Sequence, residues 1–248
     1  MIEFRVRLAD VPIGIRCVHR ENKSFLSEYL TDKEPLFSIE PKPKDVMRAQ
    51  TEFERLDLAE GREPYARSDM FLENIAIHRL LAERLTEYGV LLMHGSALCM
   101  DGAAYIFTAP SGTGKSTHAR LWREMFGERV FMINDDKPML RIRDDGVTVY
   151  GTPWDGKHDL SRNASAPLRA IAVLKRAAEN RIEPLSKEDA FPALLTQAFV
   201  SDHPEVMHRI MALEKQMLDH VAFFTLHCNM EPDAARVAYE GMIKVFPR

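Results

Sequence analysis

The chain has 248 residues, of which 46% are hydrophobic, and a formal net charge of −4. This length suits one large domain, or one domain with an appendage, and supplies enough apolar side chains for a sizeable core. The mild negative charge and the lack of a long Lys/Arg run exclude nucleic-acid binding driven by electrostatic attraction alone.

The three cysteines, Cys17, Cys99 and Cys228, are odd in number and widely spaced, which argues against a disulfide framework or a zinc site. The N-terminus alternates apolar and charged residues, unlike a signal peptide, and no segment reaches the length of a membrane span. We therefore expect a cytoplasmic globular protein that binds neither nucleic acid nor membrane.

Residues 1–89 are expected to form strands and one long helix packed on the core. Alternating apolar and polar residues predict a strand at 2–8, and Pro12 marks the start or edge of a second candidate strand at 11–18. The proline-marked stretch 34–45 is typical of a loop or a surface excursion. Residues 47–58 fit a strand or a helix. An amphipathic helix is predicted over 69–88, capped by Ser68 and ended by Gly89.

The next stretch predicts a hairpin. Asp101-Gly102 separates two apolar runs, which is a strong two-residue turn signal. Met100 then faces Ala103, and the same register carried to the end of the hairpin places His94 opposite Ala109. A histidine far away in the sequence would thereby lie beside the loop that follows the second strand. The alternative is a histidine that only ends a strand.

Residues 109–116 match the phosphate-binding (Walker A) pattern G-x-x-x-x-G-K-[ST], with Ala109 in place of the leading glycine. An apolar run precedes this loop and a helical segment, 117–126, follows it. We expect phosphate contacts from the loop, with Lys115 on the β/γ-phosphates and the Ser116 hydroxyl on Mg²⁺. The alternative is a plain glycine-rich turn. The predicted nucleotide-binding residues of the loop are Ser111, Gly112, Thr113, Gly114, Lys115, Ser116 and Thr117.

A short apolar strand, 130–133, runs into Asp135 and Asp136. Acidic residues at the carboxyl end of such a strand are where α/β nucleotide sites place an Mg²⁺ ligand. Two adjacent aspartates also occur in ordinary solvated turns. Their position one helix and one strand after Lys115 favours a functional role.

A second hairpin is expected around a three-residue loop, 144–146, which would bring Trp154 and Asp155 back towards the aspartate pair. Lys157 is then a further candidate for neutralising phosphate charge, and Trp154 for walling the pocket. A structural turn with a buried tryptophan is the alternative. Strands at 169–174, 181–185 and 221–227 and helices at 190–200, from Asp202 to about 220, and at 232–246 complete the prediction.

Together, His94, the loop 111–116 and the pair Asp135-Asp136 resemble the catalytic domain of bacterial HPr kinase/phosphorylase. The loop is also similar to that of ATP-dependent phosphoenolpyruvate carboxykinase. The resemblance covers about residues 90–160. Residues 150–157 stand where true HPr kinases carry a glycine-rich signature, so the better match is the group of short HPr-kinase-like proteins, some of which are linked to modified-peptide pathways.

The resemblance implies an α/β fold with a mixed sheet, a P-loop and flanking helices, in which residues 90–248 form the catalytic domain. It implies ATP and Mg²⁺ as cofactors, Asp135 as the base for the acceptor hydroxyl, Asp136 with Ser116 as metal ligands, and His94 near the transferred phosphoryl group. The assignment of the two aspartates is the less determined part.

The expected function is a kinase that phosphorylates a hydroxyl, foremost a serine, on a small protein or peptide. Two alternatives are a small-metabolite kinase and a nucleotide-binding regulatory module without catalysis. The sequence identifies neither the acceptor nor the oligomeric state, for which a homo-oligomer is one option. It also leaves open any phosphorylase activity and the role of residues 1–68.

Overall fold

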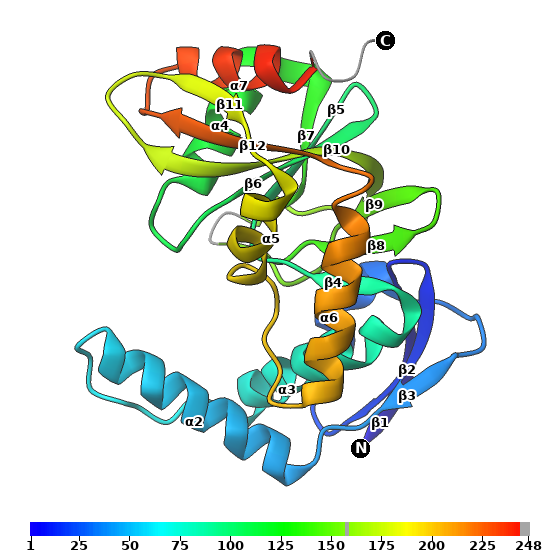
Figure 1. Cartoon of the computed structure of the whole chain (residues 1–248). Helices are drawn as coiled ribbons and strands as arrows, with labels where there is room; N and C mark the ends of the chain where they lie inside the picture. The colour runs from blue at the N-terminus through cyan, green and yellow to red at the C-terminus, as the bar shows by residue number, and fades with distance from the viewer. Residues whose placement is uncertain (157–158, 244–248) are drawn as a thin grey trace. The chain divides into compact units, whose positions relative to one another are not determined.

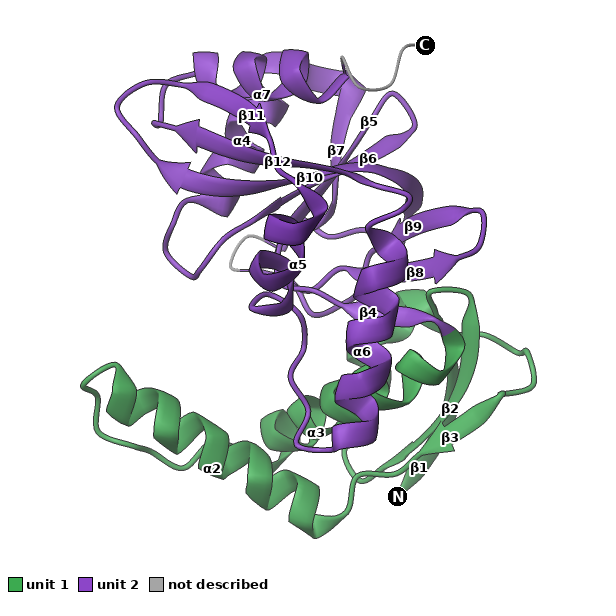
Figure 2. Cartoon of the chain, in the orientation of Figure 1, with its two compact units in different colours: residues 1–88 green, residues 89–248 purple. Residues whose placement is uncertain are grey.

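The computed structural model describes residues 1–156 and 159–243. The chain divides into two compact units, Met1–Tyr88 and Gly89–Arg248 (Figure 2). Among the described residues, no helix combines the length and apolar character needed to cross a membrane.

The first unit holds a three-stranded sheet in the order β1-β2-β3 (Figure 1). The alternating residues of the first two strands are buried on one face, as predicted, and the strands pair antiparallel through a tight turn at Ala9-Asp10, where both residues have positive φ. The strands are β1 (Ile2–Leu8), β2 (Val11–Cys17) and β3 (Phe37–Ile39).

Three helices complete the first unit: α1 (Glu21–Phe25), α2 (Pro43–Ala59) and α3 (Asp69–Leu85). The Ser68 hydroxyl accepts a hydrogen bond from the Phe71 N–H, so the predicted cap of α3 is confirmed. The loop predicted over 34–45 is wrong in part, because the stretch contains β3 and the start of α2. Pro43 occupies the first turn of α2, where its missing N–H removes no helical hydrogen bond.

The second unit is built on a nine-stranded sheet (Figure 1). Seven of its strands follow the order β4-β8-β9-β10-β6-β5-β7, and the other two lie off this path, since β12 pairs with β10 and β11 pairs with β12. The strands are β4 (Val90–Leu92), β5 (Ser96–Met100), β6 (Ala103–Thr108), β7 (Val130–Asn134), β8 (Met139–Arg143), β9 (Gly146–Tyr150), β10 (Ser165–Arg176), β11 (Arg181–Pro184) and β12 (Ala222–Cys228).

Strand direction brings the candidate residues to one edge of this sheet. Strand β5 runs antiparallel to both β6 and β7, so β6 and β7 run the same way with β5 between them. Strands β10 and β12 are also parallel to β6. The carboxyl ends of four strands and the amino end of β5 therefore meet at the same edge, which is where α/β proteins place their ligands.

Helices cover both faces of the sheet (Figure 1). On one face, α4 (Lys115–Phe126) and α7 (Asp233–Ile243) pack over Leu98, Phe107 and their neighbours, with Trp122 fully buried at the centre. On the other face, α5 (Lys187–Leu195) and α6 (Pro204–Met217) cover Ala97, Ile106 and their neighbours. The mixed α/β architecture with flanking helices agrees with the predicted fold class.

The hairpin at Asp101-Gly102 has the predicted register, with Met100 opposite Ala103. Its ladder ends at Ser96 opposite Phe107, so the expected pairing of His94 with Ala109 does not form. The apolar run before the turn breaks into β4 and β5, and β4 pairs with β8 instead. What remains of the predicted proximity is a hydrogen bond of 2.7 Å from the Thr108 hydroxyl to the His94 carbonyl.

The second hairpin is displaced by one residue from the prediction. Arg143 pairs with Gly146, so the turn is the two-residue Asp144-Asp145 and not the three-residue loop 144–146. Helices α3, α5 and α6 also end earlier than predicted, at Leu85, Leu195 and Met217. A short 3-10 helix, Thr86–Tyr88, follows α3 in the part that was predicted as its last turn.

Candidate functional site

The glycine loop joins β6 to α4. Gly112 and Gly114 have φ values of 75° and 122°, a region that other residues rarely adopt, and Gly114 lies just before the first turn of α4. Ala109 is not among the described residues with positive φ, so its backbone does not need the glycine of the consensus pattern. The first N–H groups of a helix lack intrahelical partners, which makes this helix start suited to bind an anion.

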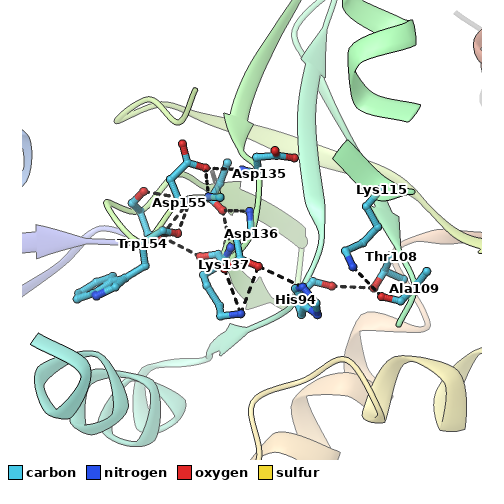
Figure 3. A network of polar contacts seen from close by, with 12 residues as sticks. His94, Thr108, Ala109, Lys115, Asp135, Asp136, Lys137, Trp154 and Asp155 are labelled. Carbon is cyan, nitrogen blue, oxygen red and sulfur yellow. Dashed lines mark hydrogen bonds and ion pairs between the residues drawn. The ribbon is translucent and has the colours of Figure 1, made fainter. Parts of the chain in front are cut away.

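Lys115 begins α4 and is 8% exposed. Its Nζ donates to the Ala109 carbonyl at 2.9 Å, so the side chain folds back over the loop (Figure 3). Burial lowers the pKa of this lysine, and the charge of Asp136 only partly opposes the effect. Backbone carbonyls thus hold the lysine in the loop. An anionic ligand bound there would replace the interactions with water that the ammonium group loses on burial.

The two aspartates that follow β7 have different surroundings. Asp135 is 5% exposed, and its Oδ1 accepts a hydrogen bond of 2.6 Å from the Ser96 hydroxyl. Asp136 is more open, and its Oδ1 lies 3.1 Å from His94 Nε2 (Figure 3). Burial opposes ionisation of Asp136, but the hydrogen bond from His94 and the charge of Lys137 together hold its pKa below the usual range.

Asn134, the last residue of β7, is fully buried and organises the turn that carries Asp136. Its Oδ1 accepts hydrogen bonds from the backbone N–H groups of Asp136 and Lys137, at 2.8 and 2.6 Å. Its Nδ2 donates to the carbonyls of Thr152 and Trp154. One amide therefore joins the aspartate turn to the loop after β9.

Asp155 holds the next part of that loop against Asp135. Its Oδ1 accepts from the N–H groups of Asp135 (3.1 Å) and Gly156 (2.7 Å), and its Oδ2 from those of Leu160 (2.6 Å) and Ser161 (2.8 Å). The predicted return of Asp155 to the aspartate pair is thus confirmed. In Figure 3 the Trp154 ring points away from Asp135. Trp154 does not line the cleft between the glycine loop and the two aspartates.

A cleft of about 680 Å³, here called the phosphate cleft, brings most of the candidate residues together. Thr113 lines a neighbouring cleft of about 460 Å³ instead, and Lys157 lies outside the described residues. The residues that line the phosphate cleft are His94, Ser111, Gly112, Gly114, Lys115, Ser116, Thr117, Asp135, Asp136, Asp155 and Gly156.

Two residues at the loop were not predicted from the sequence. Arg176, at the carboxyl end of β10, donates from its guanidinium to the carbonyls of Gly112 and Thr113. His118, in α4, is 2% exposed and accepts a hydrogen bond from the Trp122 indole at 3.1 Å, and burial lowers its pKa to about 3. His118 is therefore a neutral core residue, whereas Arg176 supports the loop from a strand far away in the sequence.

Comparison with known proteins places the chain in a family. The family model described as SynChlorMet cassette protein ScmC matches residues 68–231, which is more than half of the chain. No curated protein matches. Among solved structures, the Hpr(Ser) kinase/phosphatase from Coxiella burnetii is similar, with a TM-score of 0.38 and 10% sequence identity over 63% of this chain and 99% of that one. The extent of the family match shows that the chain belongs to the ScmC family.

Proposed function

We propose that this protein is a kinase that uses ATP and Mg²⁺ to phosphorylate a serine hydroxyl on a small protein or peptide. The observation that carries the proposal is the phosphate cleft, in which a glycine loop with a buried lysine faces two aspartates in different environments. Phosphoryl transfer requires mainly positioning, neutralisation of charge, and one carboxylate for the acceptor.

The loop and Lys115 bind the phosphates in this proposal. Gly112 and Gly114 let the backbone approach the phosphate oxygens, and the N–H groups at the start of α4 point at the same charge. Lys115 exchanges its backbone acceptors for the β/γ-phosphates. Because the lysine is already buried, this exchange restores partners to a charge that folding has removed from water.

Asp136 and Ser116 would hold Mg²⁺. Both line the phosphate cleft, and Asp136 is kept ionised by His94 and Lys137. No cluster of three or more acidic, histidine or cysteine ligands occurs among the described residues, which agrees with a metal that is bound by one or two carboxylates together with substrate phosphates. When bound there, Mg²⁺ neutralises charge on the phosphate oxygens.

Asp135 is the proposed base. Its Oδ1 accepts the hydrogen bond from Ser96, and its Oδ2 lies beside Gly156. A Cβ atom added at Gly156 would stand 3.3 Å from that Oδ2. In the reaction the acceptor O–H gives its proton to this carboxylate, the acceptor oxygen bonds to the γ-phosphorus, and the bond from that phosphorus to the β,γ-bridging oxygen breaks, which releases ADP. His94, hydrogen-bonded to Asp136, stays next to the transferred group.

A neighbouring cleft would take the nucleoside. It has a volume of about 460 Å³ and shares Gly112, Gly114 and Thr117 with the phosphate cleft. Apolar side chains at the ends of β10 and β12, including Leu174 and Cys228, line much of it. An adenine ring placed there would lie within reach of phosphates on the loop.

The test is transfer of labelled phosphate from ATP, with Mg²⁺, to a panel of serine peptides and small hydroxyl compounds. Wild type is compared with Lys115→Ala, Asp135→Asn and the matched control Asp145→Asn, which changes an exposed carboxylate in the turn between β8 and β9. We expect Lys115→Ala to lose nucleotide binding. Asp135→Asn should keep binding and lose transfer by a factor of about 100 or more.

The control should behave like wild type. If Asp135→Asn transfers phosphate as fast as the control, the base assignment is wrong. If wild type binds ATP but phosphorylates nothing in the panel, the protein is better described as a nucleotide-binding regulatory module. If only free small molecules are phosphorylated, it is a metabolite kinase.

A further inference from the structure

A third cleft also borders Asp135. It has a volume of about 400 Å³ and shares Ser116, Thr117 and Asp135 with the phosphate cleft. Beyond the shared residues it is lined by Arg120 and Arg123 from α4 and by Met132 and Leu160, and we call it the arginine cleft. Asp135 is thus a wall of both clefts, so a group in the arginine cleft borders the carboxylate in a cleft that Lys115 does not line.

The two arginines are available to an anion. Within the described residues, Arg123 makes no ion pair, and its Nε is buried without a hydrogen-bond partner. The ion pair that Arg120 makes within the described part of the chain is with Glu124 on its own helix, and both side chains are about half exposed. Exposed pairs of this kind contribute little and are readily exchanged for another carboxylate. The residues that line the cleft include two arginines and one carboxylate, Asp135, while Glu124 is not among them. An acceptor carboxylate that displaces Glu124 from Arg120 would therefore meet a positively charged lining.

The spacing along α4 relates the arginines to the phosphate site. Arg120 and Arg123 follow Ser116 by one and two helical turns, which corresponds to about 6 and 10 Å along the helix axis at 1.5 Å per residue. An extended peptide advances about 3.3 Å per residue. Ser116 borders the same cleft as Asp135, so the positions two and three residues from a serine presented there lie at comparable distances from the reacting group. The long arginine side chains can reach a carboxylate at either position.

We propose that the arginine cleft is the acceptor site and that it selects an acidic peptide, in which the phosphorylated serine has carboxylates two or three positions away that pair with Arg120 and Arg123. This inference rests on the proposed kinase function and adds the charge and direction of approach of the acceptor. A guanidinium binds a carboxylate through two parallel hydrogen bonds, so each arginine supplies specificity as well as affinity. Met132 and Leu160 provide an apolar wall for the aliphatic part of the segment.

The experiment compares serine peptides of one length that carry Glu, Ala or Lys two and three positions from the serine on either side. Wild type should prefer the Glu peptides, through a lower KM. Arg123→Met and Arg120→Met should each raise the KM for these peptides about 10- to 100-fold, the range expected for hydrogen bonds to a charged group, with kcat nearly unchanged. Arg123→Lys should keep part of the preference. The matched control Arg181→Met removes an exposed arginine on β11 and should change nothing.

Binding separates failure of this inference from failure of the kinase proposal. Affinity for a fluorescent Glu peptide is measured with a non-hydrolysable ATP analogue and Mg²⁺, at two salt concentrations, and affinity for the analogue is measured alone. We expect peptide binding that weakens with salt and with Arg123→Met, while analogue binding stays at the wild-type value.

Equal KM values for Glu, Ala and Lys peptides, or wild-type peptide binding by both arginine variants, would overturn the acceptor assignment while leaving the kinase proposal intact. Arginine-dependent phosphorylation of free small hydroxy acids, with no peptide phosphorylated, would overturn the peptide part. Loss of analogue binding in the arginine variants would show that they act on the nucleotide, which also refutes the inference.

Discussion

Replacement of Asp155 by asparagine tests whether the loop beside Asp135 is held as the structure describes. The carboxylate accepts four backbone N–H groups, two on each oxygen, from Asp135, Gly156, Leu160 and Ser161. Asparagine keeps one acceptor oxygen, so two of the four N–H groups face an NH₂ group in either orientation of the amide. Each lost bond to a charged acceptor costs about 1.5 kcal/mol, the low end of the usual range, because the loop is partly exposed. The two lost bonds together therefore cost about 3 kcal/mol.

The effect has a defined pH dependence. Burial opposes ionisation of Asp155, but the hydrogen bonds from Ser161, Gly156 and Asp135 outweigh it and hold its pKa below the ordinary value of 3.8. A lowered pKa means that the carboxylate contributes stability above pH 3.8 and loses it as the pH falls through the folded-state pKa. The difference in stability between wild type and Asp155→Asn should therefore be full at pH 7 and shrink below pH 3.8.

Urea unfolding measured from pH 7 down to about pH 3 provides the assay, with the exposed Asp145→Asn as the matched control. We also expect phosphate transfer to fall more than nucleotide affinity, because Asp155 supports Asp135 and not the glycine loop. An unfolding midpoint equal to that of wild type at pH 7 would refute the reasoning.

Three further substitutions address the site itself. Ser96→Ala removes the 2.6 Å hydrogen bond to the buried Asp135, and we expect kcat to fall about 10- to 100-fold with the KM for ATP unchanged; steady-state kinetics that show an unchanged kcat would contradict a positioning role. Gly114→Ala adds a Cβ at φ 122°, and no atom lies within 4 Å of the new carbon, so backbone strain is the expected effect and not a clash. We expect this strain to destabilise the loop by about 1–3 kcal/mol and to weaken nucleotide binding, as measured by calorimetry. Asp136→Asn should reduce Mg²⁺ affinity at saturating nucleotide by about tenfold or more and leave binding of metal-free nucleotide unchanged, and equal Mg²⁺ titrations would exclude Asp136 as a ligand.

Local signals predicted the elements around the site well. The turn at Asp101-Gly102 has a strong sequence preference, and it set the register of β5 and β6 correctly. The prediction for His94 was wrong in its pairing because a hairpin register says nothing about where a ladder ends. The strand stops at Ser96, and His94 reaches Asp136 through its side chain instead.

The sequence predicted that Asp155 returns to the aspartate pair, but the individual contacts that support the site were beyond sequence reasoning. Asp155 binds backbone N–H groups, which every residue type except proline offers, so no residue pattern marks its partners. Arg176 reaches the loop only because β10 is parallel to β6, a pairing between distant segments that no local preference encodes. The turn at 144–145 was misread because Asp-Asp-Gly fits both a two-residue and a three-residue connection.

Strand β10 gives the second unit a graded local stability. Its first residues pair with β9, and residues 170–173 pair with β6 on one side and β12 on the other. Amides enclosed in this way open only with extensive unfolding, so we expect the slowest hydrogen exchange there. The glycine loop and the aspartate turn begin where β6 and β7 end, and their amides should exchange faster. Opening of the loops that line the phosphate cleft can then occur without loss of the sheet that carries them.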